Sequence, residues 1–486
     1  MESQIYRLGS DPQPFSAGRM SDDSVDFRLE EIFFRADYRF LQNGSRCIER
    51  IFRSSDNDEY DGIFKGVDYN TLKNAVDIIS WDNYPFWHER KDEVPEAVYT
   101  SAGNALMRSL KREPFLLMES TPSSVSWRSH NPLKRPGMHM LSSMQAVAHG
   151  ADSVQYFQWR KSRGGYEKFH GAVVDHKNGS DTRTFREVTE VGKRLEHLSG
   201  GIKTFLNRAK AAIVFDWENW WAVEDTSGPR QDLDYVKCVT DHYRAFWECG
   251  LDVDFVSMDD DFSGYRLLAA PLNYMYKKGY SEKVRAFVEA GGTYVTTYFS
   301  GIVNETDLCF IGRHPLEDVL GVVSEEMDAP SKEFENCFDY NGKEYPAYTM
   351  CDIVHAKAKT EIYSVYKKDF YKGCPVVTEN AYGSGRAYYL SAESDQRFLS
   401  AFYKDVFIKA GLLKEASSAD RILKRLPHGV TAAKREDETG RKGLVFCDEF
   451  LMTGRFVWKA LESRLMQKVE KYMKMCWKWP RFHVRF

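Results

Sequence analysis

Strand-length runs of apolar residues alternate with helical segments in the first half of the chain. The strand-like runs lie at 75–85, 114–122 and 153–160, and the segments between them, at 97–112 and 137–151, have the spacing of buried helices. Parallel strands need a long crossover connection, which a helix usually supplies. The order strand, helix, strand, helix, strand therefore predicts a parallel sheet covered by helices.

Polar and aromatic residues gather at the carboxyl end of each predicted strand. The first strand ends in WDNYP (81–85), the second ends in Glu119 after the apolar run FLLM, and the third ends in YFQWR (156–160). Ligands bind at this end of the strands in a (β/α)-barrel. The pattern thus predicts a binding site at the carboxyl edge of this sheet.

A second α/β unit follows a long amphipathic helix at 181–202, which ends at a glycine pair. Its predicted strands lie at 209–219, 251–258, 265–273, 291–301 and 383–392. Glycine-terminated helical stretches separate several of them, so a doubly wound sheet is expected. We predict three domains, at 1–205, 206–410 and 411–486. The last contains a possible strand at 443–450 and a lysine-rich helix at 456–479, and no element is predicted before Phe64.

Composition narrows the function classes. Lys and Arg number 67 and Asp and Glu 71, a net charge of −4, which argues against a nucleic-acid binder with a basic face. No apolar run reaches the length of about 18 residues that a membrane helix needs, and the start MESQIYRLGSDPQPF has no apolar signal region. Nine scattered cysteines without a C-x-x-C pair support neither a disulfide framework nor a zinc site, which favours the cytoplasm. No metal or cofactor is expected.

Glu119 is the candidate catalytic residue. A carboxylate at the end of an apolar strand is costly to bury unless it is paired or hydrogen-bonded. Nucleophilic attack on an anomeric carbon is one reason for such a placement, since retaining glycosidases use one carboxylate as nucleophile and a second as acid/base. A salt-bridged or helix-capping glutamate is the alternative.

The residues around Glu119 fit sugar recognition. Aromatic faces stack on pyranose rings while polar groups bind the hydroxyls, and the candidates are Trp127, Phe157, Glu167 and His170. Tyr84 could donate its hydroxyl to the nucleophilic carboxylate and hold it ionised. Each residue also has an alternative interpretation without sugar binding. His170 could be a structural histidine, Glu167 a surface charge and Tyr84 an ordinary half-buried tyrosine.

The stretch that begins PFLLMESTPSSVSWRSHNP and runs to FHGAVVDH resembles the end of the catalytic barrel of the glycoside hydrolase family 42 β-galactosidases, and IISWDNYPFWH resembles an earlier strand. The next unit is similar to that family's second domain, which has a glutamine-amidotransferase-like fold and builds a homotrimer. The resemblance implies a partial (β/α)8 TIM barrel, retaining hydrolysis of β-galactosides with Glu119 as nucleophile, and a galactose subsite formed by Trp127, Phe157, Glu167 and His170. Tyr84 falls in the family's strand-end motif.

The amino end departs from this family. Its acid/base glutamate lies in an Asn-Glu pair upstream of the WDNYP motif, and no such pair precedes that motif here; Asn304-Glu305 lies in the second domain. We therefore expect that the first half of the barrel is missing through truncation or a frameshift. The acid/base residue stays unassigned, and little β-galactosidase activity is expected of this chain alone.

Two other functions are alternatives, and the sequence argues against the first of them. A glutamine amidotransferase needs a cysteine at a strand-to-helix turn, but the corresponding YVTTYFSGIVN (294–304) has none. A catalytically impaired fragment, or a non-catalytic sugar-binding or assembly subunit, would retain the aromatic site and lack turnover. The sequence separates neither galactosides from α-L-arabinopyranosides nor one aglycone from another.

Overall fold

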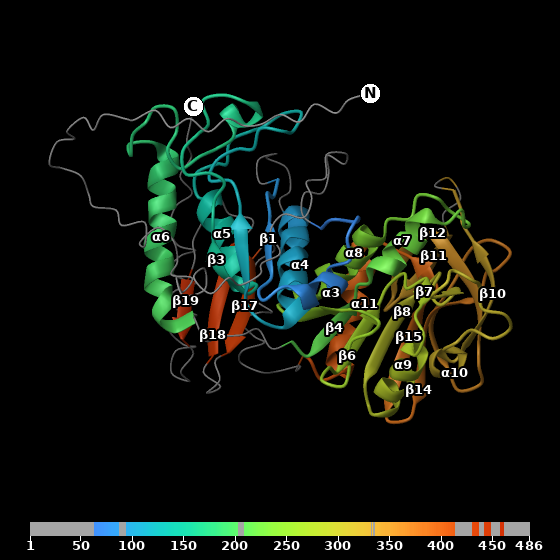
Figure 1. Cartoon of the computed structure of the whole chain (residues 1–486). Helices are drawn as coiled ribbons and strands as arrows, with labels where there is room; N and C mark the ends of the chain where they lie inside the picture. The colour runs from blue at the N-terminus through green and yellow to red at the C-terminus, as the bar shows by residue number, and fades with distance from the viewer. Residues whose placement is uncertain are drawn as a thin grey trace, which may run out of the picture.

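The computed structural model describes residues 63–86, 94–202 and 209–413, apart from 332, 334 and 335, together with strands at 430–436, 442–448 and 457–460. The first unit holds a parallel sheet of three strands in the order β1-β2-β3, and each strand is followed by a helix (Figure 1). The elements are β1 (Ser80–Asp82), α4 (Val94–Lys111), β2 (Phe115–Glu119), α5 (Met138–Ala148), β3 (Ala151–Val154) and α6 (Arg183–Ile202). Short helical turns lie at α3 (Tyr69–Leu72), η1 (Lys73–Ala75) and η2 (Tyr166–Phe169).

These three strands form part of a TIM barrel, as expected from the sequence. The strands are shorter than predicted, because β1 follows the turn at η1 and β3 ends at Val154. Parallel pairing nevertheless continues beyond them, since the Asn83 amide donates to the Glu119 carbonyl at 3.0 Å and the Phe157 amide to the Ser120 carbonyl at 3.0 Å. The three strand ends are therefore held in register at one edge.

The second unit contains a seven-stranded sheet in the order β13-β14-β15-β8-β6-β4-β5. The strands are β4 (Ala211–Val214), β5 (Val253–Val256), β6 (Leu267–Ala270), β8 (Thr293–Thr297), β13 (Glu361–Val365), β14 (Pro375–Tyr382) and β15 (Gly385–Leu390). The helices are α7 (Trp217–Asp225), α8 (Tyr235–Glu248), α9 (Tyr280–Glu289), α10 (Glu317–Leu320) and α11 (Gln396–Lys409). β15, β8, β6, β4 and β5 are parallel and their residues are largely buried, so they read as continuous apolar runs. The doubly wound fold is thus confirmed.

A second, mixed region of this unit was not predicted. β10 (Val322–Asp328), β11 (Asn336–Tyr340), β12 (Lys343–Ala356) and β16 (Ala392–Glu393) form an antiparallel sheet, and β7 (Met275–Tyr276) pairs with β9 (Val303–Asn304). Most side chains of β10 and β13 are exposed. Neither sequence, VVSEEMD nor EIYSV, alternates apolar and polar residues, so the pattern of a half-buried strand is absent.

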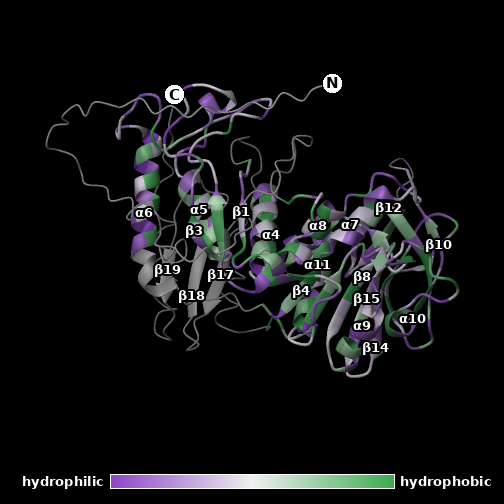
Figure 2. Ribbon diagram, viewed as in Figure 1, coloured by the Kyte–Doolittle hydropathy of each residue, from purple (hydrophilic) through white to green (hydrophobic). Residues whose placement is uncertain are grey.

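Helix α4 lies between the two units (Figure 1). Its Arg108 guanidinium contacts β5 of the second unit, with Nη1 2.6 Å from Asp254 Oδ1 and Nη2 2.6 Å from the Val253 carbonyl. Trp247 on α8 donates its indole N–H to Ser101 Oγ at 3.1 Å. Because both faces of α4 are covered, one continuous apolar core runs through both units. By contrast, α6 alternates polar and apolar positions over 183–196, as Figure 2 shows.

The carboxyl-terminal sheet corrects one prediction. β17 (Val430–Glu436), β18 (Lys442–Asp448) and β19 (Val457–Ala460) are antiparallel neighbours, and β17 and β18 lie against α5. The strand expected at 443–450 is therefore present, whereas the helix expected at 456–479 is wrong at 457–460. There Val457 and Trp458 suit a strand, and pairing with β18 outweighs the helical spacing. The remainder of that predicted helix, from 461 to 479, lies outside the described residues.

Candidate active site

Glu119 is the last residue of β2 and is partly exposed at the carboxyl edge of the sheet. Phe115 and Leu117 of β2 pack into the core, and Ser120 and Thr121 beyond the strand are buried. The Tyr84 hydroxyl donates to Glu119 Oε2 at 2.6 Å. This short bond orients the carboxylate.

His170 lies at the centre of an aromatic cluster. Its imidazole is fully buried and stacks on the Trp127 indole, with ring centroids 5.2 Å apart and planes inclined by 25°. Phe157 and Tyr84 meet the imidazole edge-on, at 5.1 Å and 5.9 Å. Tyr84 also packs edge-on against Trp127 at 4.9 Å. The structure thus brings together four of the residues that the sequence singled out.

Tyr84 connects this cluster to Glu119, since its ring contacts Trp127 and its hydroxyl reaches the carboxylate. Trp127 is 42% exposed, so part of its side chain is accessible at the site. A flat apolar face beside an oriented carboxylate is the arrangement that a glycosidase needs around the anomeric carbon.

The turn after Glu119 supports the loop that carries His170. The Gly171 amide donates to the Ser124 carbonyl at 2.7 Å, and Thr121 Oγ1 donates to the same oxygen at 3.1 Å. His170 Nδ1 lies 2.9 Å from the Gly171 carbonyl. Because a carbonyl oxygen only accepts, Nδ1 carries the hydrogen in this bond. The two loops are therefore fixed relative to each other.

Lys134 and Arg128 belong to this region and were missed from the sequence. Lys134 is 2% exposed and donates from Nζ to the Thr121 carbonyl at 2.7 Å. Burial lowers the pKa of Lys134 to about 7, with Glu187 opposing and Arg128 adding to the decrease. Nothing in the sequence marks either residue, because basic residues in a polar loop usually face solvent.

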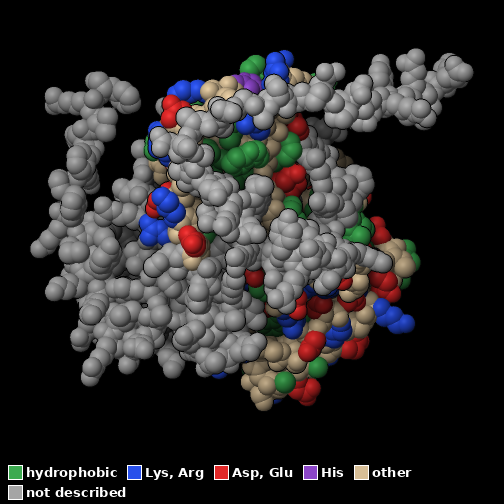
Figure 3. Space-filling model, turned by 60° about the vertical axis from the view of Figure 1, so that its left-hand side comes forward, with side chains coloured by type: hydrophobic (Ala, Val, Ile, Leu, Met, Phe, Trp, Pro, Cys, Tyr) green, Lys and Arg blue, Asp and Glu red, His purple; other side chains and the backbone are tan. Residues whose placement is uncertain are grey.

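Glu167 lies in η2, where its backbone carbonyl accepts from the His170 amide at 3.0 Å. Its side chain is partly exposed. Large apolar side chains of the neighbouring loops are strongly exposed, among them Tyr166 at 100% and Phe169 at 66%. Figure 3 shows hydrophobic side chains gathered near the top of the molecule, the side on which Figure 1 draws the loops after β2 and β3. Among the described residues, none is assigned to the acid/base role.

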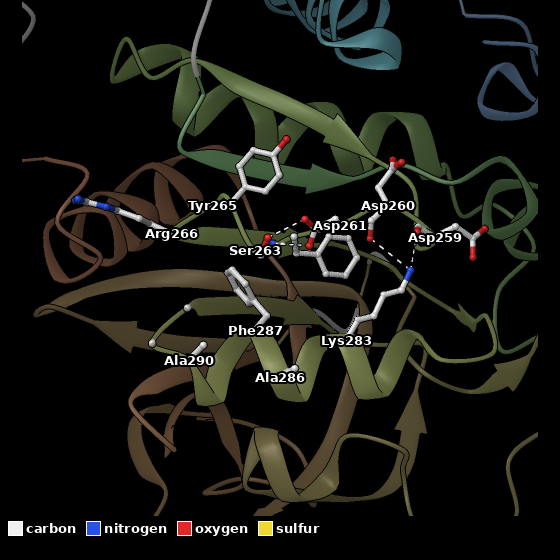
Figure 4. Close-up of a pocket in the computed structure, with 13 residues that line it drawn as sticks. Asp259, Asp260, Asp261, Ser263, Tyr265, Arg266, Lys283, Ala286, Phe287 and Ala290 are labelled. Atoms are coloured by element: carbon white, nitrogen blue, oxygen red, sulfur yellow. Dashed lines mark hydrogen bonds between the residues drawn. The ribbon is translucent and has the colours of Figure 1, made fainter. Parts of the chain in front are cut away.

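A separate pocket of about 530 Å³ lies in the second unit, between α9 and the loop that joins β5 to β6 (Figure 4). Phe287 of α9 and Ala290, the residue that follows the helix, form one wall, and Lys283 points toward Asp259 and Asp260 on the opposite loop. No residue predicted from the sequence lines it. The β5–β6 crossover lacks a helix, which leaves this part of the sheet face less covered.

Within the described residues, no group of three or more His, Cys, Asp or Glu side chains is arranged to hold a metal ion. The described helices include none that is both long and apolar enough to cross a bilayer.

Comparison with known proteins identifies both units. A family model described as β-galactosidase matches residues 33–198, and one described as the β-galactosidase trimerisation domain matches 209–413. The first match extends the resemblance upstream to residue 33, into a region where the sequence predicted no element.

Individual relatives agree with these matches. β-Galactosidase Pbg of Clostridium perfringens is 45% identical over 392 residues, which cover 78% of this chain and 56% of that protein. β-Galactosidase BglY of Alicyclobacillus acidocaldarius is 45% identical over 390 residues, covering 78% and 55%. The crystal structure of the cold-adapted β-galactosidase from Rahnella sp. R3 superposes with a TM-score of 0.75 at 46% identity, covering 79% of this chain and 57% of that one.

This chain therefore spans little more than half the length of the relatives that it matches. Over the matched length, both family models, the sequence identities and the shared fold agree. The chain belongs to the β-galactosidases of glycoside hydrolase family 42.

Proposed function

We propose that this chain performs the retaining chemistry of a β-galactosidase, with Glu119 as the nucleophile. A Glu119 carboxylate oxygen attacks the anomeric carbon of a terminal β-galactoside, the bond from that carbon to the aglycone oxygen breaks, and the aglycone leaves with the electron pair. The galactosyl ester on Glu119 is then hydrolysed by water. The bond of 2.6 Å from Tyr84 to Glu119, beside the partly exposed side chain of Trp127, is the observation that carries this proposal.

The remaining site residues would bind the sugar. Trp127 and Phe157 offer aromatic faces to the C–H surface of the ring, and His170 and Glu167 would bind its hydroxyls. His170 Nδ1 is engaged by the Gly171 carbonyl, so its ring orientation is set before a ligand binds. An acid/base carboxylate typically contributes a factor of about 10²–10⁴ in rate. Since no described residue is assigned to that role, we expect slow turnover of substrates whose leaving group needs a proton.

An activated inhibitor tests Glu119 without requiring that acid. Dinitrophenolate departs unprotonated, so 2,4-dinitrophenyl 2-deoxy-2-fluoro-β-D-galactoside should release one equivalent of phenolate and leave the fluorogalactosyl group on Glu119, located by peptide mass spectrometry. Glu119→Gln should abolish labelling. Glu113→Gln is the matched control and should label normally, because Glu113 is exposed and lies just before the amino end of the same strand. Labelling of another residue, or of none, would refute the assignment.

Galactose binding without turnover is the second candidate function. The aromatic cluster around His170 favours it, because that cluster is assembled whereas no described residue is assigned as the acid/base. Galactose should then perturb the fluorescence of Trp127 while the dinitrophenyl inhibitor releases no phenolate. Release of one equivalent would reject this alternative.

We further propose a homotrimer assembled through residues 206–410, with the barrel segment at 1–205 and a short third segment at 411–486. The family model described as a trimerisation domain supports this assembly, and light scattering after gel filtration would measure it.

A reducing compartment such as the cytoplasm is also proposed. Its support is that the six cysteines within residues 209–413 are free thiols.

A further inference from the structure

Arg128 follows Trp127 and contacts the segment that carries Tyr84. Its Nη2 donates to the Tyr84 carbonyl at 2.6 Å, and its guanidinium carbon lies 4.0 Å from the centre of the Phe86 ring. One side chain therefore binds both residues that flank Pro85, by a hydrogen bond on one side and a cation–π contact on the other.

The backbone at Arg128 is itself fixed. Its amide donates to Asn131 Oδ1 at 3.2 Å, and Asn131 Nδ2 returns a bond of 3.0 Å to the Arg128 carbonyl. The side chain is partly buried. A guanidinium that extends from such an anchored point restricts the strand end that it contacts.

Tyr84 is thus held at three places. Arg128 binds its carbonyl, Trp127 packs against its ring at 4.9 Å, and its hydroxyl meets Glu119 at 2.6 Å. The aromatic ring is rigid, so a shift of the backbone by about 1 Å carries the hydroxyl with it, out of the range of about 2.5–3.0 Å that O–H···O hydrogen bonds span. The position of the backbone consequently decides whether the hydroxyl reaches the carboxylate.

We propose that Arg128 is a positioning residue, which sets the Tyr84 hydroxyl against Glu119 and so orients the nucleophile. This inference rests on the proposed role of Glu119. Lysine cannot replace arginine here, because an ammonium has no planar face to stack on Phe86 and no fork to reach the Tyr84 carbonyl at the same time.

The kinetics of labelling by the dinitrophenyl fluorogalactoside test this role. Arg128→Met should lower the maximal rate of labelling about 10- to 100-fold, the range expected for one charge-assisted hydrogen bond, and leave the inhibitor's half-saturation concentration within about twofold. Arg128→Lys should not restore the rate. The matched control is Arg112→Met, because Arg112 also donates to a carbonyl, that of Asp261 at 3.3 Å, and lies over the Tyr265 ring, but far from the site. It should label like the parent.

A double-mutant cycle separates positioning from a general loss of structure. If Arg128 acts through the Tyr84 hydroxyl, then Arg128→Met should have little further effect in a Tyr84→Phe background. An unchanged labelling rate in Arg128→Met would overturn the proposal, as would an equal loss in both backgrounds.

A crystal structure provides a measurement that does not depend on labelling. In Arg128→Met the separation of the Tyr84 hydroxyl from Glu119 Oε2 should exceed about 3.5 Å, beyond hydrogen-bond range. Retention of the 2.6 Å contact would reject the role of Arg128. If the parent chain is not labelled, the proposed function fails, whereas this distance still decides the inference.

Discussion

Replacing Arg108 with methionine should lower the free energy of unfolding by about 3–5 kcal/mol. Arg108 and Asp254 are 5% and 7% exposed, and their side chains meet at 2.6 Å across the contact between the two units. Without the guanidinium, the Asp254 carboxylate keeps the Tyr265 hydroxyl, at 2.8 Å, as its described donor. One neutral donor does not compensate a buried charge, which is why the loss is large.

Urea unfolding monitored by tryptophan fluorescence measures this loss, and Trp247 lies at the same contact. Adding Asp254→Asn to Arg108→Met should recover part of the stability, because the amide is neutral and needs no counter-ion. The matched control is Arg285→Met. Arg285 also pairs with an aspartate, Asp318 at 3.0 Å, but both side chains are about a third or more exposed, so the cost should stay below about 1 kcal/mol.

A loss below about 1 kcal/mol for Arg108→Met would contradict the reasoning. It would mean that water reaches Asp254 once the arginine is removed. A further loss on adding Asp254→Asn would also contradict it, because the carboxylate would then be contributing stability without its partner.

Two further substitutions probe the loops around His170. Gly171→Ala would place a Cβ 2.8 Å from both the Ser124 carbonyl and Thr121 Oγ1. It should therefore lower the free energy of urea unfolding by about 1–3 kcal/mol and weaken galactose binding. The control Gly164→Ala should change neither, because a Cβ there meets open space. For Lys134, burial lowers the folded-state pKa to about 7 from 10.5, so the unfolded chain binds the extra proton between these values and the residue's contribution to stability rises with pH across that window. Lys134→Met should therefore gain stability relative to the parent near pH 6 and lose more than half of that gain by pH 9. A pH-independent difference in unfolding free energy would refute this.

The sequence predicts the parallel strands and the site at their ends because both follow from local patterns. An apolar run that stops at Glu119, and another that stops before Phe157, place those side chains at one edge by the geometry of a parallel sheet alone. The aromatic cluster follows, since the residues come from adjacent strand ends.

The supporting contacts could not be predicted in this way. Arg128 and Lys134 act through carbonyl groups of residues that the spacing of side chains does not identify. Strands β10 and β13 were missed because most of their side chains are exposed and their sequences do not alternate apolar and polar residues. The strand at Val457–Ala460 forms by pairing with β18, a long-range contact that competes with helical periodicity.

The position of α4 has a consequence for how the two units behave as a folding system. Because α4 packs inside both units, each unit would expose part of its core if it were separated from the other. The boundary between the units in the sequence is therefore not a boundary in the packing of the core. Cooperative unfolding should extend across the boundary that the sequence families mark, so substitutions in either unit alter the melting of both. The segments that the two family models match are therefore not the segments that unfold as separate units.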